Sequence, residues 1–268
     1  MSETFAKKDI YDKTGVLLLA KGQKTTDAVI AKLKKRGCYE QEAPVNSDVK
    51  QSVATFPIAL ALGERMNIRN NRVLEYPHKV LSTIIFESKT KPWWIFVNAL
   101  SNYVAWIYTH SIDVAIISLM IAVELRYNDE ELWNIGLGAF LHDVGKLLIP
   151  KPIIQKPEPL NDMEMVYIRQ HCELGMSSLE PFCLPKECTD IILQHHERLD
   201  GSGYPQGLKG DEICRNARIV MIADVVDAIT SDRPYRPHQE MDTAIKILRS
   251  DEGKYSKEFV SVLEKILE

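Results

Sequence analysis

The spacing of apolar residues changes near residue 50. Beyond it, apolar positions recur at helical intervals and strand-like alternation is weak, which predicts a helical region from about residue 52 almost to the end. Asn161 and Glu164 have the spacing of a capping box, which marks the start of a helix that leads to His171. We therefore expect an all-α main domain. Its other principal helices are expected over 94–125, 129–148, 187–196 and 217–230.

The first 50 residues follow a different pattern. Val16–Leu19 is a short apolar run between two turn signals, which predicts a buried strand. Thr25 or Thr26 can cap a helix that ends at Gly37. These elements predict a small α/β module over 1–50, including a polar linker that starts near Gln41, followed by a helical region over 51–268.

Composition and charge narrow the functional classes. The chain has 268 residues, of which 45% are hydrophobic and 26% charged, as in ordinary globular proteins. A net charge of −4 argues against a nucleic-acid polymer as partner. Five cysteines without a CxxC pair predict free thiols in a reducing compartment. The most apolar run, Val114–Val123, is too short to span a membrane, so we expect a buried core helix in a cytoplasmic protein.

Histidines carry the candidate chemistry. A single histidine on an apolar helix is usually a hydrogen-bonded core residue, and His78 and His238 are expected to be ordinary surface residues. The pair His142 and Asp143, inside GAFLHDVGKLLIP, is costly to bury without partners. Metal coordination would offset that cost, and so would a salt bridge from Asp143 to Lys146 at i,i+3 spacing. This segment alone leaves both interpretations open.

The whole set of histidines and aspartates favours a metal centre. Imidazoles mixed with carboxylates suit iron, manganese, zinc or nickel, whereas calcium prefers oxygen ligands. A carboxylate such as Asp143 has two oxygens and can bridge two metals. Two adjacent metals lower the pKa of a shared water and clamp a phosphate, which gives a rationale for phosphodiester hydrolysis. The set comprises His110, His142, Asp143, His171, His195, His196 and Asp224.

These segments resemble those of the HD-GYP phosphodiesterases, a branch of the HD-domain metal-dependent phosphohydrolases. The resemblance extends from His110 to Arg236 and implies an all-helical HD-domain bundle with its core at about 95–268. The N-terminal segment also resembles a small module that often precedes this domain. The motifs are HS (110–111), HDVGKLLIP (142–150), KPEPL (156–160), HCELG (171–175), HHERLDGSGYP (195–205) and ARIVMIADVVDAITSDRPYR (217–236).

The resemblance implies residue roles. All seven members of the His/Asp set match metal ligands, for two divalent ions per chain, with iron or manganese expected. Asp143 would bridge the metals, and Lys146 would contact the bridging hydroxide or a substrate phosphate. Tyr204, Arg233 and Arg236 would hold the phosphates and guanine bases, because a guanidinium can pair two phosphate oxygens at once.

The loop after the paired histidines should bend the chain around the site. Gly201 and Gly203 are expected to adopt backbone angles that other residues resist, and Pro205 to stiffen the exit. Glu197 and Arg198 are expected to orient metal ligands.

One position departs from part of the family. Some members carry a glutamate one helical turn before the first histidine, where it supports a third metal. Trp106 stands there in this chain and cannot ligate, so we expect a binuclear site.

The expected activity is hydrolysis of cyclic di-GMP to linear pGpG, or onward to GMP. Alternatives are the same chemistry on another cyclic dinucleotide such as cyclic GMP-AMP, or a module that senses cyclic dinucleotides or binds a partner without catalysis. A mononucleotide hydrolase is disfavoured by the intact segments Gly203–Pro205 and Asp232–Pro234. A homodimer and a regulatory protein partner stay open, as does the regulating signal.

Overall fold

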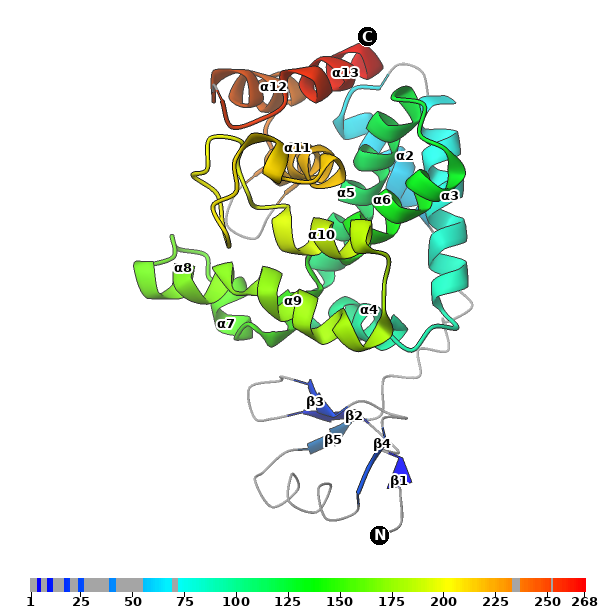
Figure 1. Ribbon diagram of the computed structural model, residues 1–268, viewed down its shortest axis with the longest axis vertical. Coiled ribbons are helices and arrows are strands. Elements are labelled where there is room, and N and C mark those ends of the chain that lie inside the picture. The colour runs from blue at the N-terminus through cyan, green and yellow to red at the C-terminus, as the bar shows by residue number, and fades with distance from the viewer. Residues whose placement is uncertain are drawn as a thin grey trace.

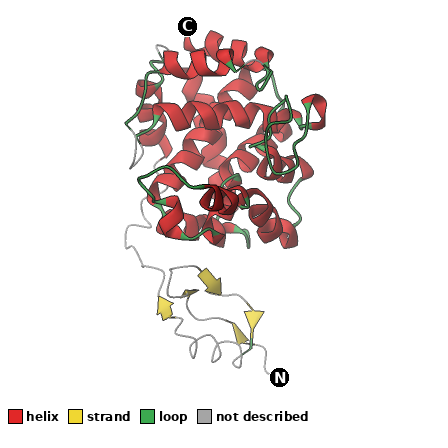
Figure 2. Cartoon of the chain, turned by 90° about the vertical axis from the view of Figure 1, so that its left-hand side faces the viewer, coloured by secondary structure: helices red, strands yellow, loops and turns green. Residues whose placement is uncertain are grey.

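The computed structural model describes residues 4–5, 9–11, 17–19, 24–26, 39–41, 55–68, 72–232, 237–251 and 253–268. Helices make up most of the part after Thr55, and strands occur in the N-terminal part (Figures 1 and 2). The α-helices are α2 (Thr55–Arg65), α3 (Arg72–Ser88), α4 (Trp94–Tyr103), α5 (Ala105–Glu124), α6 (Asp129–Leu141), α7 (Lys151–Ile154), α8 (Asp162–Arg169), α9 (His171–Leu179), α10 (Lys186–Gln194), α11 (Arg215–Thr230), α12 (Met241–Ser250) and α13 (Lys257–Leu267). Short 3₁₀ helices cover Val144–Leu148, Glu180–Phe182 and Gly210–Glu212.

The N-terminal strands form two small antiparallel sheets. One pairs β1 with β4, and the other has the order β3-β2-β5. The strand predicted at Val16–Leu19 is confirmed for its described residues, which form β3. The predicted helix up to Gly37 and the linker beyond Gln41 lie outside the described residues. The strands are β1 (Thr4–Phe5), β2 (Asp9–Tyr11), β3 (Leu17–Leu19), β4 (Lys24–Thr25) and β5 (Tyr39–Gln41).

Helix α5 lies at the centre of the bundle. Every residue from His110 to Ala122 is buried, and the helix packs against α3, α4, α6 and α11. A helix that is apolar on all sides is expected in a core. Its length and composition would also allow a membrane span, but 78% of its most apolar window is buried inside the protein. The core helix predicted around Val114–Val123 is therefore confirmed.

The single helix predicted over 94–125 is wrong. Helix α4 ends at Tyr103, and Val104 has extended backbone angles (φ −146°, ψ 102°) before α5 begins. Neither glycine nor proline marks this break. The Tyr103 hydroxyl donates a hydrogen bond to the Ile149 carbonyl at 2.8 Å, so the break allows α4 to pack against the segment after α6.

Two of the other predicted helices end earlier than expected. The helix predicted over 129–148 ends at Leu141 and continues as a turn and a 3₁₀ helix. The capping box of Asn161 and Glu164 is confirmed by two hydrogen bonds of 2.9 Å, yet α8 ends at Arg169 and a new helix starts at His171. The helices predicted over 187–196 and 217–230 correspond to α10 and α11. The four cysteines in the described part of the chain are free thiols, as expected.

Candidate metal centre

Asp143 lies at the centre of the histidine cluster, with its side chain fully buried. Its Oδ2 atom is 3.4 Å from His142 Nε2 and 3.6 Å from His110 Nε2. Its Oδ1 atom is 3.4 Å from His171 Nε2 and 4.0 Å from His195 Nε2. Each carboxylate oxygen therefore faces a different pair of histidines.

Asp224, on α11, connects the remaining histidine to this cluster. Its Oδ1 atom is 3.2 Å from His110 Nε2, and its Oδ2 atom is 3.8 Å from His196 Nδ1. The ring of His196 lies beside those of His195 and His171, with centroids 4.2 and 5.0 Å away. The structure thus brings together all seven residues of the set defined from the sequence.

Hydrogen bonds to backbone carbonyls fix three of the imidazole rings. In His142, His171 and His195 the Nδ1 atom lies 2.6, 2.6 and 3.0 Å from a carbonyl oxygen. Because a carbonyl only accepts, Nδ1 must carry the proton, and a neutral ring then directs the lone pair of Nε2 into the cluster. Metal-binding histidines are oriented in this way. The acceptors belong to Ala139, Ile168 and Ile192.

Electrostatics favour the ligand-competent protonation states of Asp143 and of three histidines. Burial, followed by the nearby Lys146 ammonium, lowers the pKa of His171 to about 4. Burial also lowers the pKa of His195 and of His196 well below the ordinary value. Burial alone would raise the pKa of Asp143, but Lys146 and the histidines outweigh it and hold that pKa well below its usual range. At neutral pH these three imidazoles are neutral and the central carboxylate is ionised.

Two buried atoms in the cluster show that the donor set fits a metal. His142 Nε2 and Asp143 Oδ1 have no hydrogen-bond partner, and an unsatisfied buried polar atom costs about 1–3 kcal/mol. His110, His142 and Asp224 offer ligand atoms within 4.8 Å of one another, as do His142, Asp143 and His195. Divalent cations on the two sides of Asp143 would satisfy these orphaned atoms, so these residues could hold metal ions.

The position of Lys146 is compatible with both interpretations that the sequence left open for Asp143, a salt bridge and metal coordination. Its Nζ atom lies 2.6 Å from Asp143 Oδ2, so the salt bridge forms while Asp143 also faces the histidines. The Lys146 side chain is 14% exposed, and those of Asp224 and His196 are 12% and 17% exposed. His110, His142, His171 and His195 are at most 3% exposed. Solvent therefore reaches the cluster from the side of Lys146, Asp224 and His196.

Asp227 has no role assigned from the sequence, although it contacts the cluster directly. Its Oδ2 atom accepts a hydrogen bond from His110 Nδ1 at 2.5 Å. Burial lowers the pKa of His110, but Asp224 and Asp227 together raise it to about 9. The spacing of Asp224 and Asp227, one helical turn apart on α11, is the sequence signal that could have identified this residue.

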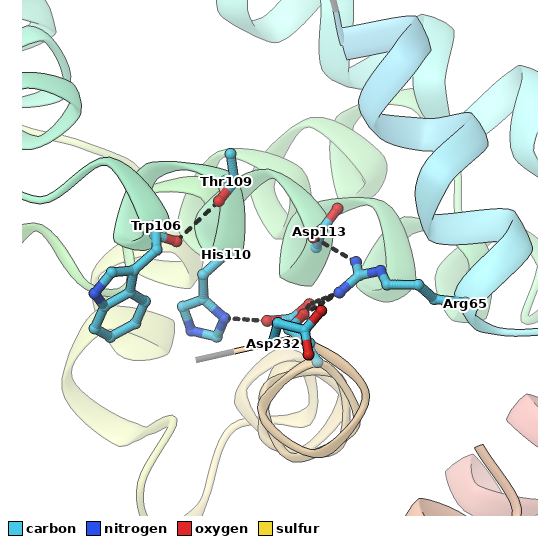
Figure 3. Close-up of a pocket in the computed structure, with 8 residues that line it drawn as sticks. Arg65, Trp106, Thr109, His110, Asp113 and Asp232 are labelled. Atoms are coloured by element: carbon cyan, nitrogen blue, oxygen red, sulfur yellow. Dashed lines mark hydrogen bonds and ion pairs between the residues drawn. The ribbon is translucent and has the colours of Figure 1, made fainter. Parts of the chain in front are cut away.

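Trp106 lines a cavity of about 230 Å³ beside His110 (Figure 3). Arg65, Asp113 and Asp232 line the same cavity. The Arg65 Nη2 atom lies 2.6 Å from Asp113 Oδ2. Burial and the neighbouring Asp227 raise the pKa of Asp113 to about 7, against the effect of Arg65.

Glu197 supports the loop after the paired histidines, and the prediction that it orients metal ligands is wrong. Its buried carboxylate accepts hydrogen bonds from the backbone N–H groups of Gln206 at 2.7 Å and Leu208 at 3.0 Å. Arg198 also points elsewhere, with its guanidinium 5.2 Å from the ring centre of Tyr255. Carboxylates that accept two backbone N–H groups hold a loop firmly, so Glu197 fixes the loop conformation.

The two loop glycines are needed for different reasons. Gly201 has φ +83°, as expected for a residue that must adopt left-handed angles. Gly203 is not in that region, so its prediction is wrong; a Cβ there would lie 2.4 Å from the backbone of Glu197 and Arg198. Close approach of two backbone segments requires glycine at 203.

Tyr204 packs directly on the cluster. Its ring stacks on His196 with centroids 4.7 Å apart, and the Arg169 guanidinium lies 5.2 Å from its ring centre. Arg169 has no role assigned from the sequence. Arg233 and Arg236, predicted to hold phosphates and bases, lie outside the described residues.

Gly145 brings α9 to the cluster. A Cβ at this position would lie 1.9 Å from the His171 carbonyl oxygen and 2.5 Å from the Gly175 nitrogen. The 3₁₀ helix and α9 therefore meet backbone to backbone. This contact places the first residue of α9, His171, opposite Asp143 Oδ1.

Comparison with known families agrees with this arrangement. Residues 95–258 match the protein family described as HD domain. The chain belongs to the HD-domain family. This match covers more than half of the chain and confirms the resemblance drawn from its motifs.

Individual relatives share the same region. The chain is 33% identical over 184 residues to the cyclic di-GMP phosphodiesterase PA4108 of Pseudomonas aeruginosa, covering 68% of this chain and 41% of that protein. It is 34% identical over 189 residues to the 3'3'-cGAMP-specific phosphodiesterase 3 of Vibrio cholerae, covering 68% and 40%. The chain thus spans less than half the length of these two relatives.

A solved structure shares the fold. Bd1817, an HDG"Y"P protein from Bdellovibrio bacteriovorus, superposes with a TM-score of 0.56 at 18% identity, covering 98% of this chain and 95% of that one. At this identity the likeness concerns the fold alone.

Proposed function

We propose that the chain is a metal-dependent phosphodiesterase that hydrolyses cyclic di-GMP to linear pGpG, or onward to GMP. The observation that carries the proposal is Asp143, whose two oxygens face separate pairs of histidines at 3.4–4.0 Å. A carboxylate placed between two groups of imidazoles suits the bridging position of a binuclear centre. The names of relatives such as PA4108 support a cyclic dinucleotide as the substrate.

The proposed cofactors are two divalent ions per chain, iron or manganese. Both suit a mixture of imidazole and carboxylate ligands. When bound, such ions activate water and stabilise negative charge on a phosphate. His110, His142 and Asp224 would hold one ion on the Oδ2 side of Asp143. His171, His195 and His196 would hold the other on the Oδ1 side.

A count of two ions also fits the surroundings of His110. Trp106 lines the adjacent cavity without offering a ligand atom. Of the carboxylates that line this cavity, Asp113 and Asp227 are already paired with the Arg65 guanidinium, and Asp232 contacts His238. We therefore propose a binuclear centre.

Lys146 and Tyr204 would act on the substrate from the exposed side. An ammonium has three N–H donors, and Asp143 takes one of them in Lys146, so others can meet a phosphate oxygen. Tyr204 stands over His196 and would offer its ring edge to a nucleotide. Arg233 and Arg236 keep their proposed role in holding phosphates and guanines.

Cyclic GMP-AMP is the second candidate substrate. The Vibrio cholerae relative named for that substrate is as similar to this chain as the relative named for cyclic di-GMP. Hydrolysis of either substrate would use the same cluster. The choice between a guanine and an adenine depends on side chains outside the metal ligands. A homodimer or a regulatory partner stays a prediction.

A turnover assay tests the proposal. Protein purified without oxygen would receive Fe²⁺ or Mn²⁺, and cyclic di-GMP and cyclic GMP-AMP would be supplied separately, with products resolved by chromatography. Linear dinucleotide supports a phosphodiesterase, and the ratio of the two rates identifies the preferred substrate. If neither substrate is cleaved although two metals are bound per chain, the proposal is wrong and a binding module becomes the better interpretation.

A further inference from the structure

Arg65 connects a helix outside the matched HD-domain region to the metal cluster. It is the last residue of α2, whereas the family match begins at residue 95. Its Nη2 atom lies 2.6 Å from Asp113 Oδ2 (Figure 3). Its Nη1 atom lies 3.4 Å from Asp227 Oδ1. Nη1 also donates to the Ser231 hydroxyl, which in turn donates to Asp227 Oδ1 at 2.6 Å. The guanidinium thus holds groups from α5 and from the end of α11.

Both oxygens of Asp227 are therefore engaged. Oδ1 faces Arg65 and Ser231, and Oδ2 accepts from His110 Nδ1 at 2.5 Å. A carboxylate held at both oxygens cannot rotate freely, so the His110 ring is fixed as well. Its Nε2 atom then points toward Asp224 at 3.2 Å. The hydrogen-bond partner of a metal-binding histidine sets the orientation and basicity of the ring.

Burial increases the need for a cation here. The side chains of Asp113 and Asp227 are 8% and 1% exposed, and they repel each other when both are charged. A buried carboxylate without a compensating charge is strongly unfavourable. Arg65, itself 26% exposed, supplies that charge from the cavity side.

We propose that Arg65 is a positioning residue of the metal centre, which acts through Asp227 to fix the ring of His110 and makes α2 part of the catalytic unit. The inference rests on the proposed metal centre. A purely structural role would instead have Arg65 stabilise the fold by neutralising two carboxylates, without effect on metal binding. The two roles differ in metal affinity.

The test is titration of the metal-free 268-residue chain with Mn²⁺ by calorimetry. Arg65→Met should weaken binding of one ion about tenfold, at the lower end of the 10–100-fold range for ligand-orienting partners. Arg65→Lys should give an intermediate affinity, because lysine keeps the charge but lacks the fork that reaches both carboxylates. Arg249→Met is the matched control. Arg249 forms an exposed ion pair with Glu264, with 2.5 Å between Nη2 and Oε2, and this pair lies away from the cluster. The control variant should bind Mn²⁺ like the wild type.

A double-variant cycle identifies the route of the effect. If Arg65 acts through Asp227, Arg65→Met should weaken binding less than twofold further in an Asp227→Asn background. Equal loss in both backgrounds would contradict that route. Wild-type affinity in Arg65→Met, with only a lower melting temperature, would overturn the inference and leave the metal centre standing. Should that variant not fold, wild-type affinity in Arg65→Lys would overturn it. A wild type that binds no Mn²⁺ would refute the metal centre and the inference together.

Discussion

Gly145 offers a direct test of how the metal cluster is assembled. In Gly145→Ala the new Cβ would lie 1.9 Å from the His171 carbonyl oxygen, and real Cβ atoms are not found closer than 3.0 Å. The obstacle is a backbone atom, which cannot rotate away as a side chain can. Helix α9 must therefore move away from the 3₁₀ helix by about the difference between 1.9 and 3.0 Å. His171 Nε2, now 3.4 Å from Asp143 Oδ1, would move with it. We expect a loss of 1–3 kcal/mol in the free energy of unfolding, about the usual cost of overpacking, together with weakened metal binding.

Gly175→Ala is the matched control, because it adds the same methyl group on the other side of the same contact. Its Cβ would lie 3.2 Å from Gly145 N and 3.2 Å from an Ile192 side-chain carbon, which requires only a small adjustment. Urea unfolding in the presence of a chelator measures stability, and Mn²⁺ titration measures affinity. Equal effects of the two substitutions, or unchanged Mn²⁺ affinity in Gly145→Ala, would refute the conclusion that this backbone contact positions His171.

Three further predictions concern the cluster itself. Asp143→Ala should lose both bound metal, measured by metal analysis after dialysis, and turnover; wild-type turnover would contradict the bridging role. Lys146→Ala should keep its metal while kcat falls about 10²–10³-fold, and loss of metal would instead give Lys146 a structural role. Acidification of the chelator-treated protein from pH 6.5 to 4 should lower its free energy of unfolding, by about 3 kcal/mol from His171 alone. In the unfolded chain His171 takes up a proton near pH 6.5, whereas in the folded chain it does so only near pH 4. His171→Gln should therefore show a shallower pH dependence of the free energy of unfolding in urea. An unchanged slope would contradict the conclusion that burial keeps His171 neutral.

The sequence predicts the helical character of the main domain and places helices in the regions of α4 to α6, α8, α10 and α11, because their apolar positions recur at helical spacing. It does not predict their ends. Val104 interrupts a continuous apolar pattern without a glycine or proline, and only the packing of Tyr103 against Ile149 explains the break. The turn after Leu141 is followed by the close contact between Gly145 and α9, which lies about 30 residues further along the chain.

The candidate ligands could be found from residue types and motif spacing, but their supporting residues could not. Arg65 and Asp227 are 162 positions apart, and no periodicity links them. Glu197 adjoins the paired histidines in sequence, yet its carboxylate turns toward the loop. Proximity in sequence therefore led to a wrong role for Glu197 and gave no indication of Arg65. The orientation of both side chains depends on contacts that form only in the folded chain.

The early ends of the helices have a chemical consequence. The last four carbonyls of a helix lack intrahelical N–H partners. Ala139, Ile168 and Ile192 occupy such positions at the ends of α6, α8 and α10, and each accepts the Nδ1 proton of a histidine that follows within three residues. Had α6 continued, as its pattern predicts, the carbonyl of Ala139 would have bonded to the backbone of residue 143. Termination of these helices therefore fixes the imidazole tautomers and directs each Nε2 lone pair at the same centre.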